Sequence, residues 1–325
     1  MARSMLYPLI FQPVFRRYLW GGRRLESVLG KKIGEGNDYA ESWEIVDRGA
    51  DQSVVLHGKL AGSTLNDLVT EYAVELFGKQ HPWKQFPLLF KFLDANRSLS
   101  VQVHPDDAQA ARLDPPDLGK TEAWFVLESQ PGSNVYAGLR PGVDREMLAR
   151  KIANGETESC LHQFQPRVGD CIFIPAGTVH ALGEGLLVAE IQQASDTTFR
   201  LYDWDRRDAD GRSRQLHIQE SLEIADYESG PVGPQTPLPT DNAARVRLVT
   251  CDKFVLERWS LSESGTIPAV DSCHLLAILS GSLEIEHDSV PTPLGAGQTM
   301  VIPASCVGTR FTPLQPTVLL DIWLP

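Results

Sequence analysis

Three short segments of the chain each place a side chain that can bind a metal ion beside a turn. They read SVQVHP, GKTEAW and PAGTVH, and they carry His104, Glu122 and His180. Side chains alternate between the two faces of a strand, so Gln102 would share the face of His104, and Lys120 that of Glu122. Two imidazoles, a carboxylate and an optional amide suit Zn²⁺ and tolerate Mn²⁺, Co²⁺ or Fe²⁺. Because structural zinc is usually closed by thiolates, this ligand set indicates an open, catalytic site.

Each of these residues has a simpler explanation when it is taken alone. A buried histidine is most often a core residue, and a glutamate or lysine in a strand most often lies on the solvated face. The joint pattern is more specific, because three separate strands each bring a metal-compatible group next to a turn. We therefore interpret His104, Glu122 and His180 as ligands of one metal ion, with Gln102 as a further candidate.

A second polar cluster lies in the string TTFRLYD, where Arg200 and Tyr202 would share one face if the segment is a strand. An arginine is always cationic, and its planar fork can hold a phosphate or stabilise an anionic intermediate. The alternative is a structural ion pair of Arg200 with Asp203, Asp205 or Glu190.

The elements that must position these groups are mostly short strands. Apolar runs bounded by Gly, Pro, Asp or Ser predict strands at residues 88–93, 99–103, 123–127, 171–174, 186–192 and 199–202. Helical spacing of apolar residues predicts helices at 64–78, after Pro105 and at 144–152. The pattern is typical of a mainly β fold of jelly-roll barrels with a few helices inserted in or packed on the first. The absence of GxGxxG and P-loop motifs disfavours nucleotide binding.

Two strings of the chain can be aligned with each other. GDCIFIPAGTVH at 169–180 and GQTMVIPASCVG at 297–308 share the bend glycine, a strand ending in Ile, a Pro-Ala turn and a Val. This is the turn-strand-turn pattern of a cupin barrel, and chance similarity is the alternative. In this alignment Gly308 takes the place of His180, so the second copy is expected to lack the metal.

A Pro/Gly-rich stretch at residues 228–240 is the best linker in the chain. We therefore expect a catalytic metal-binding cupin domain with helical segments at residues 1–235. A degenerate cupin-like β domain without metal ligands is expected at residues 241–325.

Composition narrows the class of partners and the compartment. The chain carries 30 basic and 42 acidic residues, a formal net charge of −12, which disfavours nucleic acid and anionic membranes as partners. Its five cysteines show no CxxC spacing and are expected to be reduced thiols of a cytoplasmic protein. No signal peptide or membrane span is predicted, and we expect a monomer or a small homo-oligomer.

Several strings together resemble one enzyme family. FPLLFKFLDANRSLSVQVHPDD, GKTEAWFVLE, GDCIFIPAGTVHAL and EIQQASDTTFRLYDWDR are similar to type I mannose-6-phosphate isomerases of the cupin superfamily, in their shorter bacterial form. The resemblance spans residues 6 to about 227. It implies one Zn²⁺ per chain, bound by a set of four ligands: Gln102, His104, Glu122 and His180. It further implies that Arg200 is catalytic and that Lys120 lies near the substrate.

The resemblance implies interconversion of mannose 6-phosphate and fructose 6-phosphate through an enediol or enediolate. Lys120, Arg200 and Tyr202 would bind the phosphosugar. The general base stays open between Lys120, a metal-bound hydroxide and a carboxylate such as Glu190. Alternatives are a cupin isomerase or epimerase for another phosphosugar, a cupin dioxygenase, and a sugar-phosphate-sensing cupin without turnover.

Overall fold

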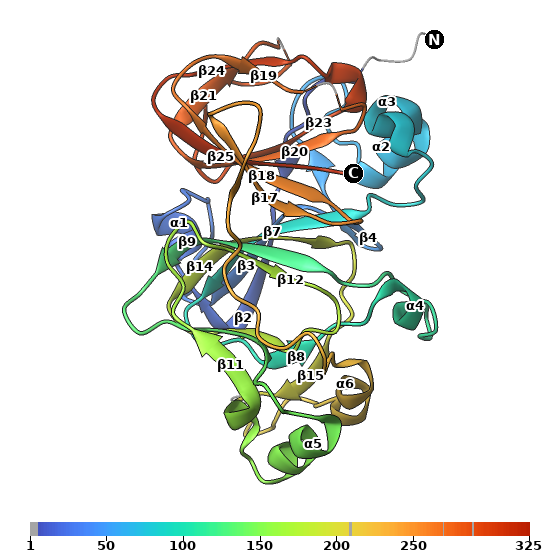
Figure 1. Cartoon of the computed structure of the whole chain (residues 1–325). Coiled ribbons are helices and arrows are strands. Elements are labelled where there is room, and N and C mark those ends of the chain that lie inside the picture. Colours follow the sequence, from blue (N-terminus) through green and yellow to red (C-terminus); the bar gives the residue numbers. More distant parts are fainter. Residues whose placement is uncertain (1–5, 208–209, 269, 288) are drawn as a thin grey trace.

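The computed structural model describes residues 6–207, 210–268, 270–287 and 289–325. Residues 1–5, at the start of the segment in which no signal peptide is predicted, lie outside these ranges. Within them the chain forms two antiparallel β-sandwiches, one stacked on the other (Figure 1). None of the helices in these ranges has the length and apolar character needed to cross a bilayer.

The first sandwich consists of a six-stranded and a five-stranded sheet. The six-stranded sheet has the order β12-β9-β14-β7-β3-β2, with β2 (Val14–Gly22), β3 (Tyr39–Ile45), β7 (Leu88–Ala95), β9 (Glu122–Ser129), β12 (Cys171–Ile174) and β14 (Leu186–Gln193). The five-stranded sheet has the order β11-β10-β13-β8-β15, with β8 (Val101–Val103), β10 (Val135–Leu139), β11 (Leu161–Phe164), β13 (His180–Leu182) and β15 (Phe199–Tyr202). Two short pairs flank them, β1 (Phe11–Gln12) with β6 (Val54–Val55) and β4 (Asp47–Arg48) with β5 (Asp51–Gln52).

The second sandwich consists of a six-stranded and a four-stranded sheet. The larger sheet has the order β16-β17-β18-β25-β20-β23, with β16 (Leu238–Pro239), β17 (Arg245–Thr250), β18 (Val255–Leu261), β20 (His274–Ser280), β23 (Thr299–Ile302) and β25 (Thr317–Trp323). The smaller has the order β19-β24-β21-β22, with β19 (Gly265–Thr266), β21 (Ser282–Ile285), β22 (Leu294–Gly295) and β24 (Arg310–Pro313). The mainly β fold class is confirmed, but the described strands form open sandwiches instead of closed barrels, because each sheet has two free ends.

The helices lie outside the sheets and only partly match the predictions. The expected helix at 64–78 begins after Thr64, whose side chain forms a capping box with Asp67, but it breaks at Tyr72, where φ is −127°. It is therefore two helices, α2 (Leu65–Glu71) and α3 (Ala73–Phe77). The predicted α4 (Asp107–Ala110) and α5 (Arg145–Ala153) are present, whereas α6 (Ile218–Ile224) was not predicted. The remaining helical turns are α1 (Arg24–Ser27), η1 (Gly78–Gln80), η2 (Thr157–Cys160) and η3 (Ala304–Cys306).

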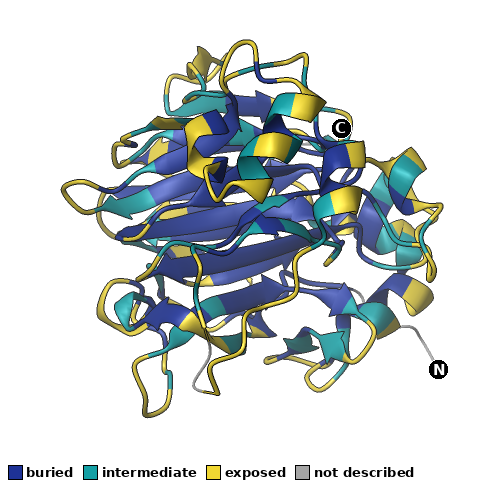
Figure 2. Ribbon diagram, turned by 90° about the horizontal axis from the view of Figure 1, so that it is seen from below, coloured by how far each residue is buried: buried dark blue, intermediate teal, exposed yellow. Residues whose placement is uncertain are grey.

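The two six-stranded sheets pack against each other through one continuous apolar core. Phe90 and Leu187 of the first sheet and Leu275 and Ile322 of the second belong to this cluster, to which α2 and α3 also contribute. Leu9 exchanges two backbone hydrogen bonds with Val301 and so ties the N-terminal arm to the second sandwich. Figure 2 shows the buried residues concentrated in the stacked sheets and the exposed ones on helices and loops.

The strand orders of the two six-stranded sheets correspond position by position. β12, β9, β14, β7, β3 and β2 match β23, β20, β25, β18, β17 and β16. The two copies of the repeated string thus lie on matching edge strands, β12 and β23. Glu122 pairs with Ile174 of the first copy, and His274 pairs with Ile302 of the second. His274 therefore occupies, in the second sandwich, the place that Glu122 has in the first.

Candidate metal centre

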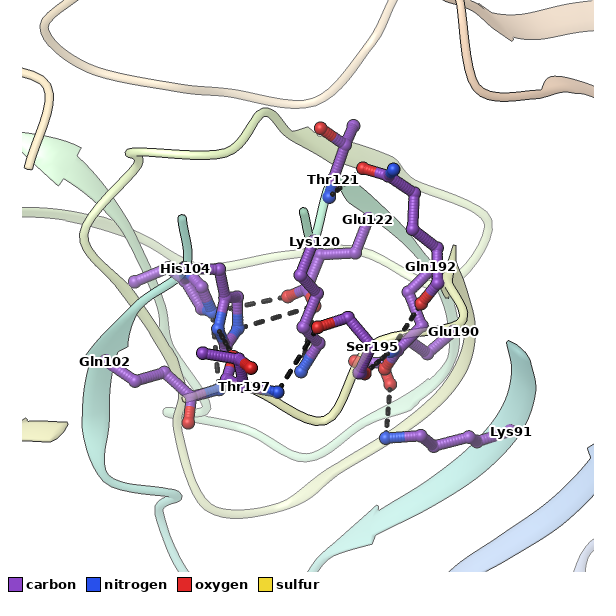
Figure 3. Close-up of polar contacts among 12 residues, drawn as sticks. Lys91, Gln102, His104, Lys120, Thr121, Glu122, Glu190, Gln192, Ser195 and Thr197 are labelled. Carbon is purple, nitrogen blue, oxygen red and sulfur yellow. Dashed lines mark hydrogen bonds and ion pairs between the residues drawn. The ribbon is translucent and has the colours of Figure 1, made fainter. Parts of the chain in front are cut away.

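His104, Glu122 and His180 converge in the interior of the first sandwich. Figure 3 shows His104 and Glu122 pointing toward each other, with Gln102 and Lys120 beside them. His104 follows β8, Glu122 begins β9 and His180 begins β13, so both sheets contribute. One ligand atom from each lies within 4.8 Å of the others. His180 Nε2 is 3.2 Å and His104 Nε2 is 3.6 Å from the nearer carboxylate oxygen of Glu122. All three side chains are buried, so a metal ion here would be shielded from bulk water.

Backbone carbonyls fix the orientation of both imidazoles. His104 Nδ1 lies 2.9 Å from the Thr197 carbonyl oxygen, and His180 Nδ1 lies 2.8 Å from that of Thr178. A carbonyl only accepts, so each Nδ1 carries the proton and each Nε2 keeps a lone pair directed at the centre. His104 Nε2 and both oxygens of Glu122 have no hydrogen-bond partner among the described residues. Buried polar atoms without partners are costly, and a divalent cation would satisfy all of them.

The protonation of the triad matches the needs of a metal site only in part. Burial lowers the pKa of His180 to about 4 and holds that of His104 well below its ordinary value, so both imidazoles are neutral ligands. Burial, together with the nearby Glu190 carboxylate, raises the pKa of Glu122 to about 8 in the absence of metal. A metal ion must therefore displace the Glu122 proton at neutral pH.

Metal affinity is accordingly expected to rise with pH and to level off above about pH 8. Between the low pKa of His180 and the raised pKa of Glu122, binding releases one proton, which corresponds to up to about tenfold tighter binding per pH unit. Competition with a chromophoric chelator across this range measures the slope, and calorimetry in two buffers counts the proton. A flat profile would show that Glu122 is already ionised.

Gln102 links the triad to Arg200 across three neighbouring strands. In the five-stranded sheet Gln102 pairs with His180 on one side and with Arg200 on the other. Its amide nitrogen lies 3.3 Å from His180 Nε2. Val101 and Val103, the alternate residues of the strand, pack on the opposite face with α5 and α6. As placed, the amide nitrogen steadies His180, and turning the amide over would present its oxygen to the centre as a ligand.

Two buried lysines, Lys91 on β7 and Lys120 just before β9, complete the polar interior. Lys120 Nζ is 3.6 Å from a Glu122 oxygen, and Lys91 Nζ is 3.2 Å from Glu190. Glu190 also accepts a hydrogen bond from the Trp124 indole at 2.9 Å. Burial opposes the charge of Glu190, but Lys91 and Lys120 outweigh it and lower its pKa. Sequence reasoning missed Lys91, although a lone lysine inside the apolar run LLFKFL was a signal of a buried partner.

A pocket of about 310 Å³ extends from this interior to the surface. Its wall includes Gln102, Lys120, Glu190, Arg200 and a cation that was not predicted, Arg214. The Arg200 guanidinium donates to Ser100 Oγ at 3.0 Å and to the Gln215 carbonyl at 3.1 Å. Among the described residues it forms none of the alternative ion pairs with Asp203, Asp205 or Glu190. Arg200 is thus held in place without a carboxylate that would neutralise it.

Comparison with known proteins identifies the family. Residues 9–121 match the model of the type I phosphomannose isomerase catalytic domain. The chain is 36% identical over 301 residues to the probable mannose-6-phosphate isomerase GmuF of Bacillus subtilis, covering 92% of this chain and 94% of that one. It is 35% identical to the mannose-6-phosphate isomerase of Streptococcus mutans, covering 94% and 96%. The chain belongs to the type I mannose-6-phosphate isomerase family.

A solved structure of this family superimposes over nearly the whole chain. The mannose 6-phosphate isomerase of Bacillus subtilis matches with a TM-score of 0.88 and 29% identity over 98% of this chain and 99% of that one. A phosphomannose isomerase from Salmonella typhimurium shares the fold, with a TM-score of 0.81 at 15% identity. The similarity of this type I isomerase to its relatives therefore includes the second sandwich, where the sequence strings alone fit loosely.

Tyr202 is the one predicted site residue that the structure of this type I isomerase places neither in the His104–Glu122–His180 triad nor in the pocket wall. A register shift between Arg200 and Tyr202 breaks the strand alternation, so the two side chains do not share a face as expected. The Tyr202 ring lies 5.3 Å from that of Trp204, and its hydroxyl donates to Asp205 at 3.3 Å. Its position gives no support to the predicted contact with substrate.

The second sandwich of the isomerase has a different interior. His274, at the place of Glu122, has its Nδ1 2.8 Å from Asp321 Oδ1, and both side chains are buried. Ile267 and Phe311 fill the apolar core near β19 and β24. In the part of the chain that the structure describes, the only cluster of three His, Cys, Asp or Glu residues able to hold a metal is the one in the first sandwich.

Proposed function

We propose that the chain interconverts mannose 6-phosphate and fructose 6-phosphate at one Zn²⁺ ion held by His104, Glu122 and His180, with Gln102 as a further ligand. The observation that carries this proposal is the set of buried, unpartnered ligand atoms in the interior of the first sandwich, beside a pocket with cations in its wall. The choice of mannose 6-phosphate as substrate rests on the names of the relatives, which are mannose-6-phosphate isomerases. In this proposal, residues 1–235 form the catalytic unit, residues 241–325 its support, and the enzyme acts in the cytoplasm.

The charges of the pocket explain how an acidic protein could bind an anionic substrate. Lys91, Lys120, Arg200 and Arg214 all line the pocket, against a net charge of −12 for the whole chain. Three carboxylates, Glu41, Glu190 and Asp196, lie in the same wall, and Lys91 contacts two of them, Glu41 and Glu190. The four cations therefore exceed the carboxylates of the wall by one, which favours an anionic phosphosugar. The local field in the pocket therefore opposes that of the surface.

The reaction moves a proton between C1 and C2 of the open-chain sugar, and negative charge develops on the carbonyl oxygen. A bound divalent ion would supply Lewis-acid polarisation of that oxygen. Arg200 and His180 are separated by the one strand that carries Gln102, and Arg200 would stabilise the enediolate through its guanidinium. Arg214 is more exposed, with its nearest carboxylate, Asp203, 3.8 Å away, and would hold the phosphate.

Two groups of the chain are in place to carry the proton. Lys120 lies beside Glu122 at the metal end of the pocket. Glu190 is ionised, but its Oε1 accepts from the Trp124 indole and its charge is balanced by Lys91, 3.2 Å from Oε2, which weakens it as a base. We therefore assign proton transfer to Lys120. The Lys91–Glu190 ion pair would influence the protonation of Lys120 and Glu122 through its charges.

A coupled assay tests this function directly. Purified protein should form fructose 6-phosphate from mannose 6-phosphate, lose turnover on dialysis against a chelator and regain it with Zn²⁺. Glucose 6-phosphate and other aldose phosphates serve as the matched substrate panel. Absence of turnover on mannose 6-phosphate with metal bound would overturn the proposal in favour of a sugar-phosphate sensor, or of another phosphosugar if one of the panel reacts.

A further inference from the structure

The segment that carries Lys120 and Glu122 is anchored by side chains outside the metal centre. Gly119 N donates to Asp107 Oδ1 at 2.8 Å, and Thr121 N donates to Gln193 Oε1 at 3.0 Å. Gln193 Nε2 also donates to Asp107 Oδ1, at 2.9 Å, so one carboxylate oxygen holds both anchors. Because Lys120 and Glu122 flank Thr121, a shift of this anchor would move both functional groups.

The same anchor joins the segments that carry the other two ligands. Lys120 N donates to the carbonyl of Pro105, the residue after His104, at 3.0 Å. The Thr121 hydroxyl accepts from Ala176 N at 3.3 Å, in the turn that precedes His180. At Gly119 an added Cβ would lie 2.5 Å from Asp107 N, so only glycine allows this close approach. The three ligand segments therefore meet around residues 119–121.

The second oxygen of Asp107 is held from the other sandwich. Lys253, in the loop between β17 and β18, donates to Asp107 Oδ2 at 2.6 Å. Partial burial opposes the charge of Asp107, but hydrogen bonds from Lys253, Gln193 and Gly119 outweigh it and lower the pKa of its carboxyl. Lys253 also contacts the exposed Asp252 at 2.8 Å.

We propose that Lys253 is a positioning residue for the metal centre, which acts through Asp107 and Gln193 to fix the segment bearing Lys120 and Glu122. The second sandwich, which holds no comparable cluster among the described residues, thereby takes part in catalysis without touching the substrate. This inference rests on the proposed isomerase function. It assigns a role to the contact between Lys253 and Asp107, which joins the two sandwiches. By itself, such a partly exposed ion pair would contribute little to stability.

The Lys253→Met variant tests the proposal, assayed with saturating Zn²⁺. We expect kcat to fall by about tenfold, because small displacements of catalytic groups are costly, while KM, metal content and the unfolding temperature stay close to wild type. Lys253→Arg keeps the charge and should restore kcat to within about twofold. Asp252→Asn, which removes the other partner of Lys253, is the matched control and should leave kcat unchanged.

Two further measurements separate positioning from general stabilisation. In the double variant Asp107→Ala/Lys253→Met, kcat should equal that of Asp107→Ala alone, because both changes break one path. Amide exchange of Gly119 and Thr121 should accelerate in Lys253→Met, while core strands keep their protection. The proposal would be overturned if kcat and the amide exchange rates were unchanged in Lys253→Met. It would also be overturned if the kcat losses of the two single variants were additive in the double variant, or if Lys253→Arg did not restore kcat. The exchange result stands even if the wild type lacks isomerase activity, so the two failures are distinguishable.

Discussion

The His180→Ala variant is expected to lose its bound metal, and with it nearly all turnover. His180 supplies one of three buried ligand atoms, and alanine offers no ligand atom in place of the imidazole. Loss of an outer-shell partner alone costs about 10–100-fold in metal affinity, so loss of a direct ligand should exceed about 100-fold. Elemental analysis of the purified variant and the coupled assay measure both quantities.

His57→Ala is the matched control for this variant. His57 is an exposed histidine far along the chain from the triad, and its replacement should change neither metal content nor activity. The unfolding temperature of the two variants should be compared after metal removal, so that loss of metal is not mistaken for loss of fold. A full metal complement in His180→Ala would remove His180 from the ligand set.

The Arg200→Ala variant is expected to keep its metal and to lose about 10²–10³-fold in kcat. The guanidinium is held by Ser100 and Gln215 and is separated from the triad by Gln102 alone, so it can act on developing charge without binding the metal. Steady-state kinetics with mannose 6-phosphate and elemental analysis test the two halves of this expectation.

Arg214→Ala is the informative comparison, because Arg214 lines the same pocket but lies further from the triad in the proposed arrangement. It should raise KM with a smaller effect on kcat, as expected for a phosphate contact made equally in the ground and transition states. A normal kcat in Arg200→Ala would exclude Arg200 from the mechanism. If kcat fell as much in Arg214→Ala as in Arg200→Ala, Arg214 could not be assigned to phosphate binding alone.

Strand alternation and turn positions were enough to place the triad. His104 and His180 each adjoin a turn, and the alternation that pairs Gln102 with His104 and leaves the two valines on the other face holds in the structure. Lys91 could not be found in the same way, since every residue of β7 is buried and the run shows no alternation. Its role follows only from its partner, Glu190, which is distant in sequence.

Three other features depended on tertiary structure. The face of Tyr202 was misassigned because a local register shift leaves no trace in the residue pattern. α6 packs on the outer face of the five-stranded sheet, and its few apolar residues gave a weak helical signal. Closed barrels and open sandwiches share the same strand pattern, so only the strand order could decide between them.

The continuous core between the two six-stranded sheets restricts how this chain can change over time. A sheet whose outer face belongs to a continuous apolar core cannot be left bare in water without self-association. The second sandwich, whose described residues form no such metal cluster, is thus protected from deletion because its loss would expose this core. An ancestral duplication, once joined in this way, would be kept as a pair even after only one member retained the chemistry.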